Sequence, residues 1–260
     1  VGLLTTEEEW LNGPPGSTGP TWIATSLSYD AYGNVKTVTD ALLRTTTNTY
    51  DASTSTFLEQ ITNALGHSRQ LTYDPRTGQV LTSTDQNDVT TTTLYDPLGR
   101  VTKVIGPNDT EDLPTISYEY DLSSVPYKTT THARIESGQP DVITAYAFTD
   151  GLGRTIQTRS PAEDPQKQVV TGIVEFNNRG LADKQWVPYF SNLSTSYVPV
   201  TSEPNWESLA KVQYTYDPPR RLISVIDPDS STATTTYDDW TVTVTDAKGH
   251  QTKRTSDAYG

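Results

Sequence analysis

Three histidines, His67, His132 and His250, are the side chains of this 260-residue sequence best suited to proton transfer near neutral pH. Metal binding or catalysis would need a partner at a suitable spacing, such as a second histidine four residues along a helix, and none has one. The sequence has no cysteine, which excludes thiolate zinc sites and cysteine nucleophiles. His67 and His250 each follow a glycine in the same repeated turn. We therefore predict no catalytic residue, no metal ligand and no cofactor.

Acidic side chains also gather in short groups, which makes calcium the alternative to consider. The groups are Asp85/Asn87/Asp88, Asp227/Asp229 and Asp238/Asp239. Calcium needs about six to eight oxygen atoms around it, and the sequence has neither an EF-hand loop nor a Gly-Asp nonapeptide repeat. Asp and Asn also open tight turns by accepting backbone hydrogen bonds. We favour this structural role and keep bound calcium as the alternative.

Tryptophans are the remaining candidates for ligand contact, because flat aromatic rings can stack on sugars. The candidates are Trp22, Trp186, Trp206 and Trp240, together with Trp10. The structural alternative is that these rings fill gaps between strands and cover insertions. We favour gap filling, whereas exposed rings gathered on one face would indicate a binding surface.

A repeated aromatic–aspartate motif predicts the elements that position all of these residues. Tyr29, Tyr50, Tyr73 and Tyr95 are each followed by Asp and are spaced 21, 23 and 22 residues apart. Asp opens a turn, Pro presets the next φ angle, and Gly supplies the left-handed conformation that reverses the chain. The residues expected to build these turns are Tyr29, Asp30, Gly33, Tyr73, Asp74, Gly78, Tyr95, Asp96, Gly99, Arg100, Asp150, Gly153, Arg154, Tyr216 and Asp217.

A second Asp- or Asn-led turn follows each motif after about 11 residues, as at Asp40, Asn63 and Asp85. Between the turns lie alternating segments such as 34–39 and 241–245, which are typical of short strands. Thr and Tyr are abundant and favour strands, while the hydrophobic content of 33% is too low for a thick core. We therefore predict an all-β fold of antiparallel β-hairpin repeats forming a curved, spiralling sheet.

Residues 1–22 are predicted to be an N-terminal segment with a Gly/Pro linker, and residues 23–260 the repeat array. Loop insertions are expected near 106–114, 135–140 and 188–206, with a helical turn following the last one at 207–210. Thr6-x-x-Glu9 matches a capping box, which predicts a short N-terminal helix.

Tyr95–Thr102 closely resembles the YD repeat, also called the RHS repeat, in which Tyr-Asp is followed by Gly-Arg and a β segment. Phe148–Thr158 resembles it too, and the resemblance runs from about Tyr29 to the last residue. The stretch Gly151–Phe190 is similar to the middle region of SpvB-like and TcB-like toxin-complex proteins. The final residues, Asp257-Ala258-Tyr259-Gly260, resemble the start of another repeat, which indicates an internal fragment of a longer array.

The resemblance implies a β-sheet wound into a hollow shell around a toxic cargo, of which this chain would be one part. Self-cleaving relatives use aspartates in a terminal core motif that this sequence lacks, so the resemblance supplies no catalytic residue. We predict a non-catalytic, structural segment of a secreted or cell-surface bacterial protein. The alternative is an adhesin-like module that recognises glycans or a protein partner.

The partners expected are the remainder of its own polypeptide and an enclosed toxin cargo. The net charge of −13 argues against binding nucleic acid or anionic membranes. Apolar runs of about four residues are too short for membrane insertion. Edge strands of such an array invite pairing with another chain.

Overall fold

A computed structural model of the chain describes residues 2–11 and 21–257. The chain divides into two compact units. Unit 1 consists of Val1–Ser117 and Arg134–Asp141, and unit 2 consists of Tyr118–Ala133 and Val142–Gly260. In the described part of the chain, no helix is long and apolar enough to cross a membrane.

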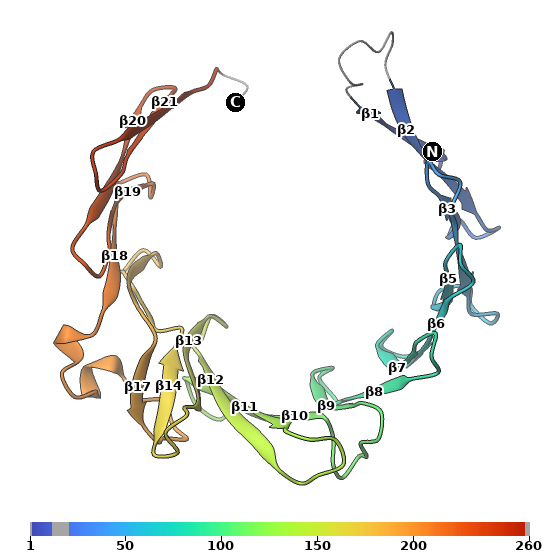
Figure 1. Cartoon of the computed structure of the whole chain (residues 1–260), viewed down its shortest axis with the longest axis horizontal. Helices are drawn as coiled ribbons and strands as arrows, with labels where there is room; N and C mark the ends of the chain where they lie inside the picture. The colour runs from blue at the N-terminus through green and yellow to red at the C-terminus, as the bar shows by residue number, and fades with distance from the viewer. Residues whose placement is uncertain (1, 12–20, 258–260) are drawn as a thin grey trace. The chain divides into compact units, whose positions relative to one another are not determined.

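Unit 1 is a run of short antiparallel strands in which each strand pairs with the next one along the chain, from β1 to β9. Figure 1 shows them following one another as a single layer from blue to green. The strands are β1 (Thr6–Leu11), β2 (Thr21–Tyr29), β3 (Val35–Thr39), β4 (Thr45–Tyr50), β5 (Leu58–Thr62), β6 (Ser68–Tyr73), β7 (Val80–Thr84), β8 (Thr90–Tyr95) and β9 (Val101–Ile105).

Strands β10 (Ile116–Asp121) and β11 (Tyr127–Arg134) each contain residues of both units, and the remaining strands belong to unit 2. Unit 2 contains the strand order β12-β13-β14-β17 and a separate sheet, β15-β16-β18-β19-β20-β21-β22. These strands are β12 (Val142–Thr149), β13 (Thr155–Pro161), β14 (Lys167–Thr171), β15 (Val174–Phe176), β16 (Ala182–Trp186), β17 (Tyr189–Asn192), β18 (Lys211–Tyr216), β19 (Leu222–Ile226), β20 (Thr232–Asp238), β21 (Thr241–Thr245) and β22 (Gln251–Thr255).

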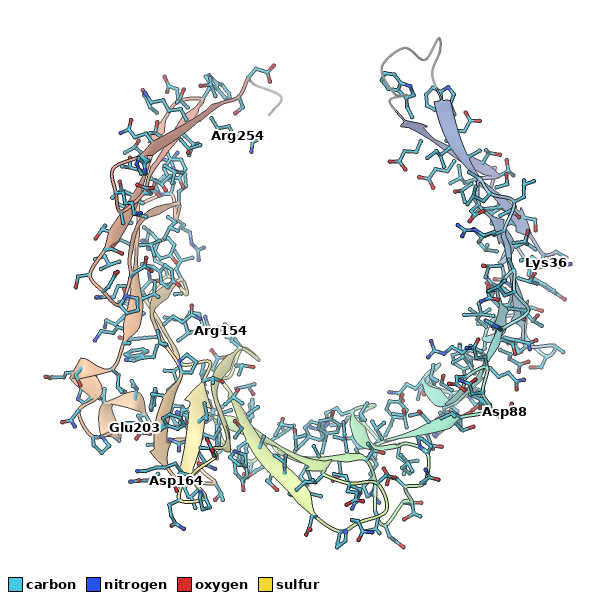
Figure 2. All side chains as sticks on the ribbon, viewed as in Figure 1. Lys36, Asp88, Arg154, Asp164, Glu203 and Arg254 are labelled. Carbon is cyan, nitrogen blue, oxygen red and sulfur yellow. The ribbon has the colours of Figure 1, made fainter. Side chains whose placement is uncertain are left out.

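The predicted all-β, antiparallel hairpin fold is confirmed. Side chains project from both faces of the strands, as Figure 2 shows, and most are half-buried or exposed. Among the described residues of unit 1, no Val, Ile, Leu, Phe, Tyr or Trp is buried. Unit 1 therefore depends on its backbone ladders and turns more than on an apolar core.

The predicted N-terminal helix is wrong, because the Thr6-x-x-Glu9 segment lies within strand β1. That strand pairs antiparallel with β2, and Trp10 lies opposite Trp22. Pairing of the two strands outweighs a local capping signal, since a single helical turn is unstable by itself. The predicted Gly/Pro linker, Gly13–Pro20, lies outside the described part of the chain.

Two of the predicted insertions are loops between neighbouring strands, and the third contains a short strand of its own. Residues 106–114 separate β9 from β10, and residues 135–140 separate β11 from β12. Asp109 connects these two loops, because its carboxylate accepts hydrogen bonds from the Ser137 hydroxyl and the Gly138 N–H, both at 2.8 Å. Residues 188–206 contain β17 and a 3-10 turn, η1 (Val200–Ser202), and the predicted helical turn at 207–210 is the 3-10 turn η2 (Trp206–Ser208).

Candidate functional site: repeat corners and a buried arginine clamp

Tyr-Asp motifs such as Tyr95-Asp96 form a tight turn, here called a corner, that the aspartate closes. At Asp96 the backbone N–H donates to the Arg100 carbonyl, and the Gly99 N–H donates to the Asp96 carbonyl, both at 2.9 Å. Asp96 Oδ1 also accepts from the backbone N–H groups of Leu98 and Arg100. Gly99 has a φ of +80°, the left-handed conformation in which a Cβ atom would be strained. The corner therefore uses the carboxylate as a fixed acceptor for its own backbone.

An arginine four residues after the turn aspartate binds the other carboxylate oxygen at several turns. Arg100 Nε lies 2.7 Å from Asp96 Oδ2, and the pairs Asp40/Arg44, Asp150/Arg154 and Asp217/Arg221 repeat this geometry. Two of these guanidinium groups also lie over an aromatic ring of the following repeat, at 3.6 Å for Arg154 over Phe176 and 4.2 Å for Arg221 over Tyr237. The arginine thus links a corner to the next repeat.

Tyrosine hydroxyls form a second link between neighbouring repeats. Tyr95 Oη donates to the carbonyl of Val80, fifteen residues earlier, at 2.8 Å. The strand register shifts by one residue at this tyrosine, as in a β-bulge. The same hydrogen bond joins Tyr50 to Val35, Tyr73 to Leu58 and Tyr237 to Leu222. We call this set the tyrosine ladder.

The structure places all the predicted turn residues at corners. Asp30, Asp96, Asp150 and Asp217 each accept a hydrogen bond from the backbone N–H four residues later. The Asp74 corner is one residue longer and ends at Gly78, whose φ is +74°. At the Asp217 corner Arg220 replaces the expected glycine, with a φ of +76°.

Leu43 is a strained residue in the return turn that begins at Asp40. Its φ is +62°, and its side chain is 84% exposed, so no buried packing offsets the strain.

We expect Leu43→Gly to stabilise unit 1 by about 0.5–1 kcal/mol, because relief of the strain exceeds the added flexibility of glycine. Thermal and urea unfolding followed by circular dichroism would measure the change. Leu42→Gly, at the adjacent exposed position, is the control and should give no gain. A lower stability for Leu43→Gly would contradict the assignment.

Hydrogen bonds at the corners lower the pKa of their carboxyl groups. The backbone N–H of Arg100 is the main cause at Asp96, and that of Arg154 is the main cause at Asp150. At Asp40 the hydrogen bond from the Arg44 side chain contributes most to the lowered pKa. Each corner is therefore most stable with its carboxylate ionised.

This depression of the pKa predicts acid sensitivity. The stability that each ionised carboxylate adds to the folded state is fully present above the pKa of about 3.9 that Asp has in the unfolded chain. It is lost as the pH falls through the lower pKa that the same group has in the folded chain. We expect the melting temperature to change little from pH 7 to about 5 and to fall below about pH 4. Circular dichroism melts of Asp96→Asn should show a smaller acid loss than the parent, and Glu59→Gln, at an exposed strand position, should match the parent. A melting temperature unchanged to pH 3 would refute this account.

The tryptophans lie in different surroundings. Trp10 and Trp22 lie opposite each other on β1 and β2 and are 60% and 54% exposed. Trp240 is exposed at the tip of the β20–β21 hairpin, and Trp206 is half-buried in η2. The ligand-facing interpretation is wrong for Trp186, which is 4% exposed and packs in the core of unit 2.

Local turns hold two of the acidic groups and His250, whereas His132 lies in β11 with its Nδ1 2.9 Å from Thr144 Oγ1 of β12. Asp85 Oδ1 accepts from the N–H groups of Asn87 and Val89, and Asp229 Oδ1 accepts from Ser231 N–H. His250 Nδ1 lies 2.9 Å from Asp246 within one turn. Within residues 2–11 and 21–257, no three His, Cys, Asp or Glu side chains lie close enough to hold a metal ion.

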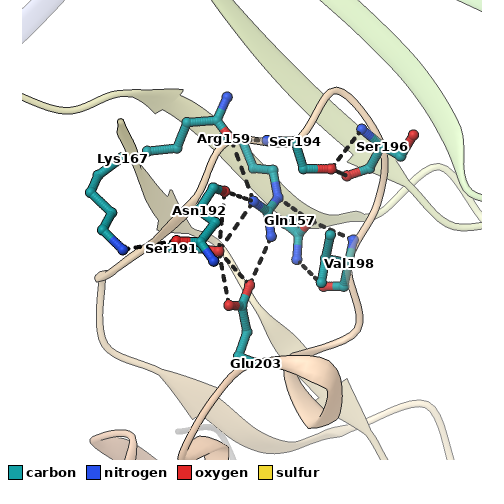
Figure 3. Close-up of polar contacts among 10 residues, drawn as sticks. Gln157, Arg159, Lys167, Ser191, Asn192, Ser194, Ser196, Val198 and Glu203 are labelled. Carbon is teal, nitrogen blue, oxygen red and sulfur yellow. Dashed lines mark hydrogen bonds and ion pairs between the residues drawn. The ribbon is translucent and has the colours of Figure 1, made fainter. Parts of the chain in front are cut away.

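A buried arginine on β13 joins the 188–206 insertion to the strands of unit 2, as Figure 3 shows. Arg159, on β13, is completely buried. One guanidinium nitrogen lies 2.9 Å from Glu203 Oε1, and Nε donates to Gln157 Oε1 at 3.0 Å. Ser191 Oγ lies within 2.8 Å of both Glu203 carboxylate oxygens. We call Gln157, Arg159, Gln168, Ser191 and Glu203 the Arg159 clamp.

The two glutamines of the clamp hold the backbone of the insertion. Gln157 Nε2 donates to the Val198 carbonyl at 2.7 Å, and its Oε1 accepts from Val198 N–H. Gln168 Oε1 accepts from Ser194 N–H at 2.9 Å. The insertion is therefore tied to β13 and β14 by side chains that replace its missing strand partners.

An apolar cluster lies beside the clamp. Val170, Ile173 and Trp186 are buried there, and Tyr189, Val200 and Leu209 pack against them. Burial raises the pKa of Tyr189 to about 12, with a further contribution from the Glu203 charge. The insertion thus covers the buried apolar cluster of unit 2. The polar groups of the clamp hydrogen-bond to one another, and these bonds hold the insertion in place.

Sequence reasoning did not identify the clamp. Gln157 and Arg159 alternate with Ile156 and Thr158 along β13, a pattern that normally directs the polar residues to solvent. The one available signal was the 40-residue spacing between Phe176 and Tyr216, which marked an insertion that needed support.

The chain matches one family model in part, and its fold is similar to that of solved toxin-complex structures. Residues 122–239 match a family model described as a domain of unknown function, DUF6443. Among curated proteins, none matches this sequence.

The chain is similar to a crystal structure of TcdB2-TccC3, with a TM-score of 0.71 and 20% identity, over 92% of this chain and 14% of that chain. It is similar to TcdB2-TccC3 without the hypervariable C-terminal region, with a TM-score of 0.71 and 17% identity, over 94% of this chain and 17% of that chain. A Tc holotoxin pore from Photorhabdus luminescens gives a TM-score of 0.69 and 17% identity, over 92% of this chain and 16% of that chain. The chain therefore has the β fold of these toxin-complex structures and spans 14–17% of their length.

Proposed function

We propose that this chain is a YD-repeat (RHS-repeat) segment that forms part of a β-shell around a toxin-like cargo in a secreted bacterial protein. The observation that carries the proposal is the tyrosine ladder, which joins Tyr50, Tyr73, Tyr95 and Tyr237 to the preceding repeats. A wall needs such contacts between neighbours, because a single layer has little apolar core to hold it. The likeness to the toxin-complex structures supports the same role.

The proposed role is mechanical. Backbone ladders form the wall, the aspartate corners set where it turns, and the Arg159 clamp fastens an insertion onto it. The partners are the remainder of its own longer polypeptide and the enclosed cargo, with no nucleic acid and no insertion into a membrane.

Limited proteolysis of the native polypeptide that contains this chain tests the proposal. We expect mass spectrometry to show that a cargo segment resists protease until denaturant opens the wall. Cleavage of every segment outside this chain at the rate of an exposed linker would overturn it.

A second candidate function is favoured by the exposed Trp10 and Trp22 pair, which an adhesin-like module could use to stack on glycans. Glycan-array binding by the 260-residue chain, compared with Trp10→Ala and Trp22→Ala variants, tests it. Binding that both variants lose would favour this function, and absence of binding would remove it.

A further inference from the structure

The two faces of the unit 1 sheet differ in chemistry. Residues that lie directly opposite each other on paired strands share a face, and so do alternate residues along one strand. The register places Thr47 opposite Thr37 on one neighbouring strand and opposite Thr62 on the other. Followed across the sheet, this face, here called the hydroxyl face, consists of Ser26, Ser28, Thr37, Thr39, Thr45, Thr47, Thr49, Gln60, Thr62, Ser68, Gln70, Thr72, Thr82, Thr84, Thr90 and Thr92.

The hydroxyl face has neither a charged nor a large apolar side chain. Its hydroxyl groups hydrogen-bond to one another across neighbouring strands, as at Thr39/Thr45 (2.9 Å) and Thr84/Thr90 (2.8 Å). All of its residues are half-buried or exposed. Strands β2–β8, which carry this face, each pair with a neighbour on both sides, so the face is continuous across the sheet.

The opposite face, here called the tyrosine face, carries the rings of the tyrosine ladder. Leu71 and Tyr73 alternate with Thr72 along β6 and therefore point away from the hydroxyl face. Ile61 lies opposite Arg69 on the tyrosine face. This face therefore offers aromatic rings, aliphatic side chains and a cation.

The charged residues of strands β2–β8 are Lys36, Glu59 and Arg69. Arg69 belongs to the tyrosine face, and its Nε donates to Ser83 Oγ of that face at 2.9 Å. Lys36 and Glu59 are the additional residues of two β-bulges beside the corners, where the register shifts. The strand pairs that build the hydroxyl face therefore contain no charge.

The same division of threonine and tyrosine recurs in the second sheet of unit 2. Tyr237 lies opposite Val242, whereas the preceding Thr236 lies opposite Thr243 on the other face. In this sheet the face is not free of charge, because Lys253 lies opposite Thr243. The division therefore belongs to the repeat. A polar row runs through directly paired residues of β18 to β22, namely Thr215, Ser224, Thr234, Thr245 and Gln251.

We propose that the hydroxyl face lines the inside of the shell, where it lets a cargo polypeptide move along the wall without being held. This inference rests on the proposed function. Removing water from hydroxyl and amide groups costs free energy unless new hydrogen bonds replace those to water, so the face disfavours close contact with apolar segments. Having no charge, it attracts neither cationic nor anionic segments. The tyrosine face, by contrast, has the rings and aliphatic groups to which an apolar segment adheres.

Cysteine labelling of the native polypeptide that contains this chain tests which face is inside. The chain has no cysteine, so single substitutions report each face separately. Thr47→Cys and Thr62→Cys report the hydroxyl face, and Thr46→Cys and Thr91→Cys, also half-buried, report the tyrosine face. We expect a bulky polyethylene glycol maleimide to modify the hydroxyl-face cysteines at least about tenfold more slowly, because the wall must open first. In denaturant all four should react alike.

Equal rates on the two faces of the native polypeptide, or slower reaction on the tyrosine face, would overturn the assignment. The proteolysis experiment keeps this failure separate from a failure of the proposed function. A cargo segment that resists protease while both faces react alike leaves the enclosure intact and removes only the inference about the hydroxyl face.

Leucine substitutions test whether the hydroxyl face is needed for movement of the cargo. In Thr47→Leu/Thr62→Leu/Thr92→Leu, we expect the cargo segment to become accessible to protease at least about threefold more slowly in mild denaturant, less than burial of one methylene group would give. The matched control, Thr46→Leu/Thr91→Leu/Thr93→Leu, adds the same groups to the tyrosine face and should behave like the parent. Unchanged accessibility in the first variant, or equal slowing in both, would overturn the proposal, and the single cysteine variants test it without the triple changes.

Discussion

Arg159→Met is expected to lower the free energy of unfolding of unit 2 by about 3–5 kcal/mol. The substitution keeps the apolar stem but leaves the Glu203 carboxylate buried without its cation, and Gln157 Oε1 loses a donor. Urea unfolding would report the loss, and hydrogen exchange should show residues 189–209 opening before the rest of unit 2.

The double variant Arg159→Met/Glu203→Leu separates the charge from the packing. Removing both charges should recover most of the lost stability, because apolar pairs of similar volume often replace a buried ion pair without cost. Lys36→Met, at an exposed position of unit 1, is the control and should change stability by less than about 0.5 kcal/mol. A double variant as unstable as the single one would show that the ion pair is not the source of the effect.

Replacing three tyrosines of the ladder, Tyr50, Tyr73 and Tyr95, by phenylalanine is expected to destabilise unit 1 by about 2–4 kcal/mol. Each substitution removes one hydrogen bond, worth about 0.5–1.5 kcal/mol, while keeping the ring. The effect is large for unit 1 because the described part of this unit has no buried apolar core to compensate.

Chemical denaturation of the triple variant measures this loss, with Tyr32→Phe as the control. Tyr32 lies at the tip of a corner with 76% of its surface exposed, so its change should stay below about 0.5 kcal/mol. Equal effects of the control and the triple variant would exclude the ladder as the cause.

The repeats were predictable because their signals are local. At one corner, Tyr95 marks the end of the strand, Asp96 closes the turn, and Gly99 is where φ becomes positive. This information lies within a few residues and recurs every 21 to 23 positions in residues 29–95, so the residue types together with their spacing predict the hairpins and their antiparallel pairing. The hydroxyl contacts of the ladder, by contrast, join residues fifteen positions apart, which the spacing of the motifs does not reveal.

The errors came from contacts distant in sequence. Thr6 and Glu9 carry a local helix signal, but pairing with β2 makes that segment a strand. Arg159 received no role from the sequence, because its partner Glu203 lies 44 residues away within an insertion of irregular structure. Trp186 and Trp22 both occur in strands, and only the folded insertion determines that Trp186 is covered.

The short reach of the tyrosine hydroxyls affects how a gene for such an array can change in length. Since each hydroxyl reaches only the repeat before it, excising residues 74–95 would join Tyr73 directly to Asp96 and restore an intact corner. Two strands leave together, so the up-and-down alternation of the remaining ones is preserved. Duplication or loss of DNA that encodes one whole repeat therefore leaves the turn at the junction intact. The array can in this way change its size in steps of about 22 residues.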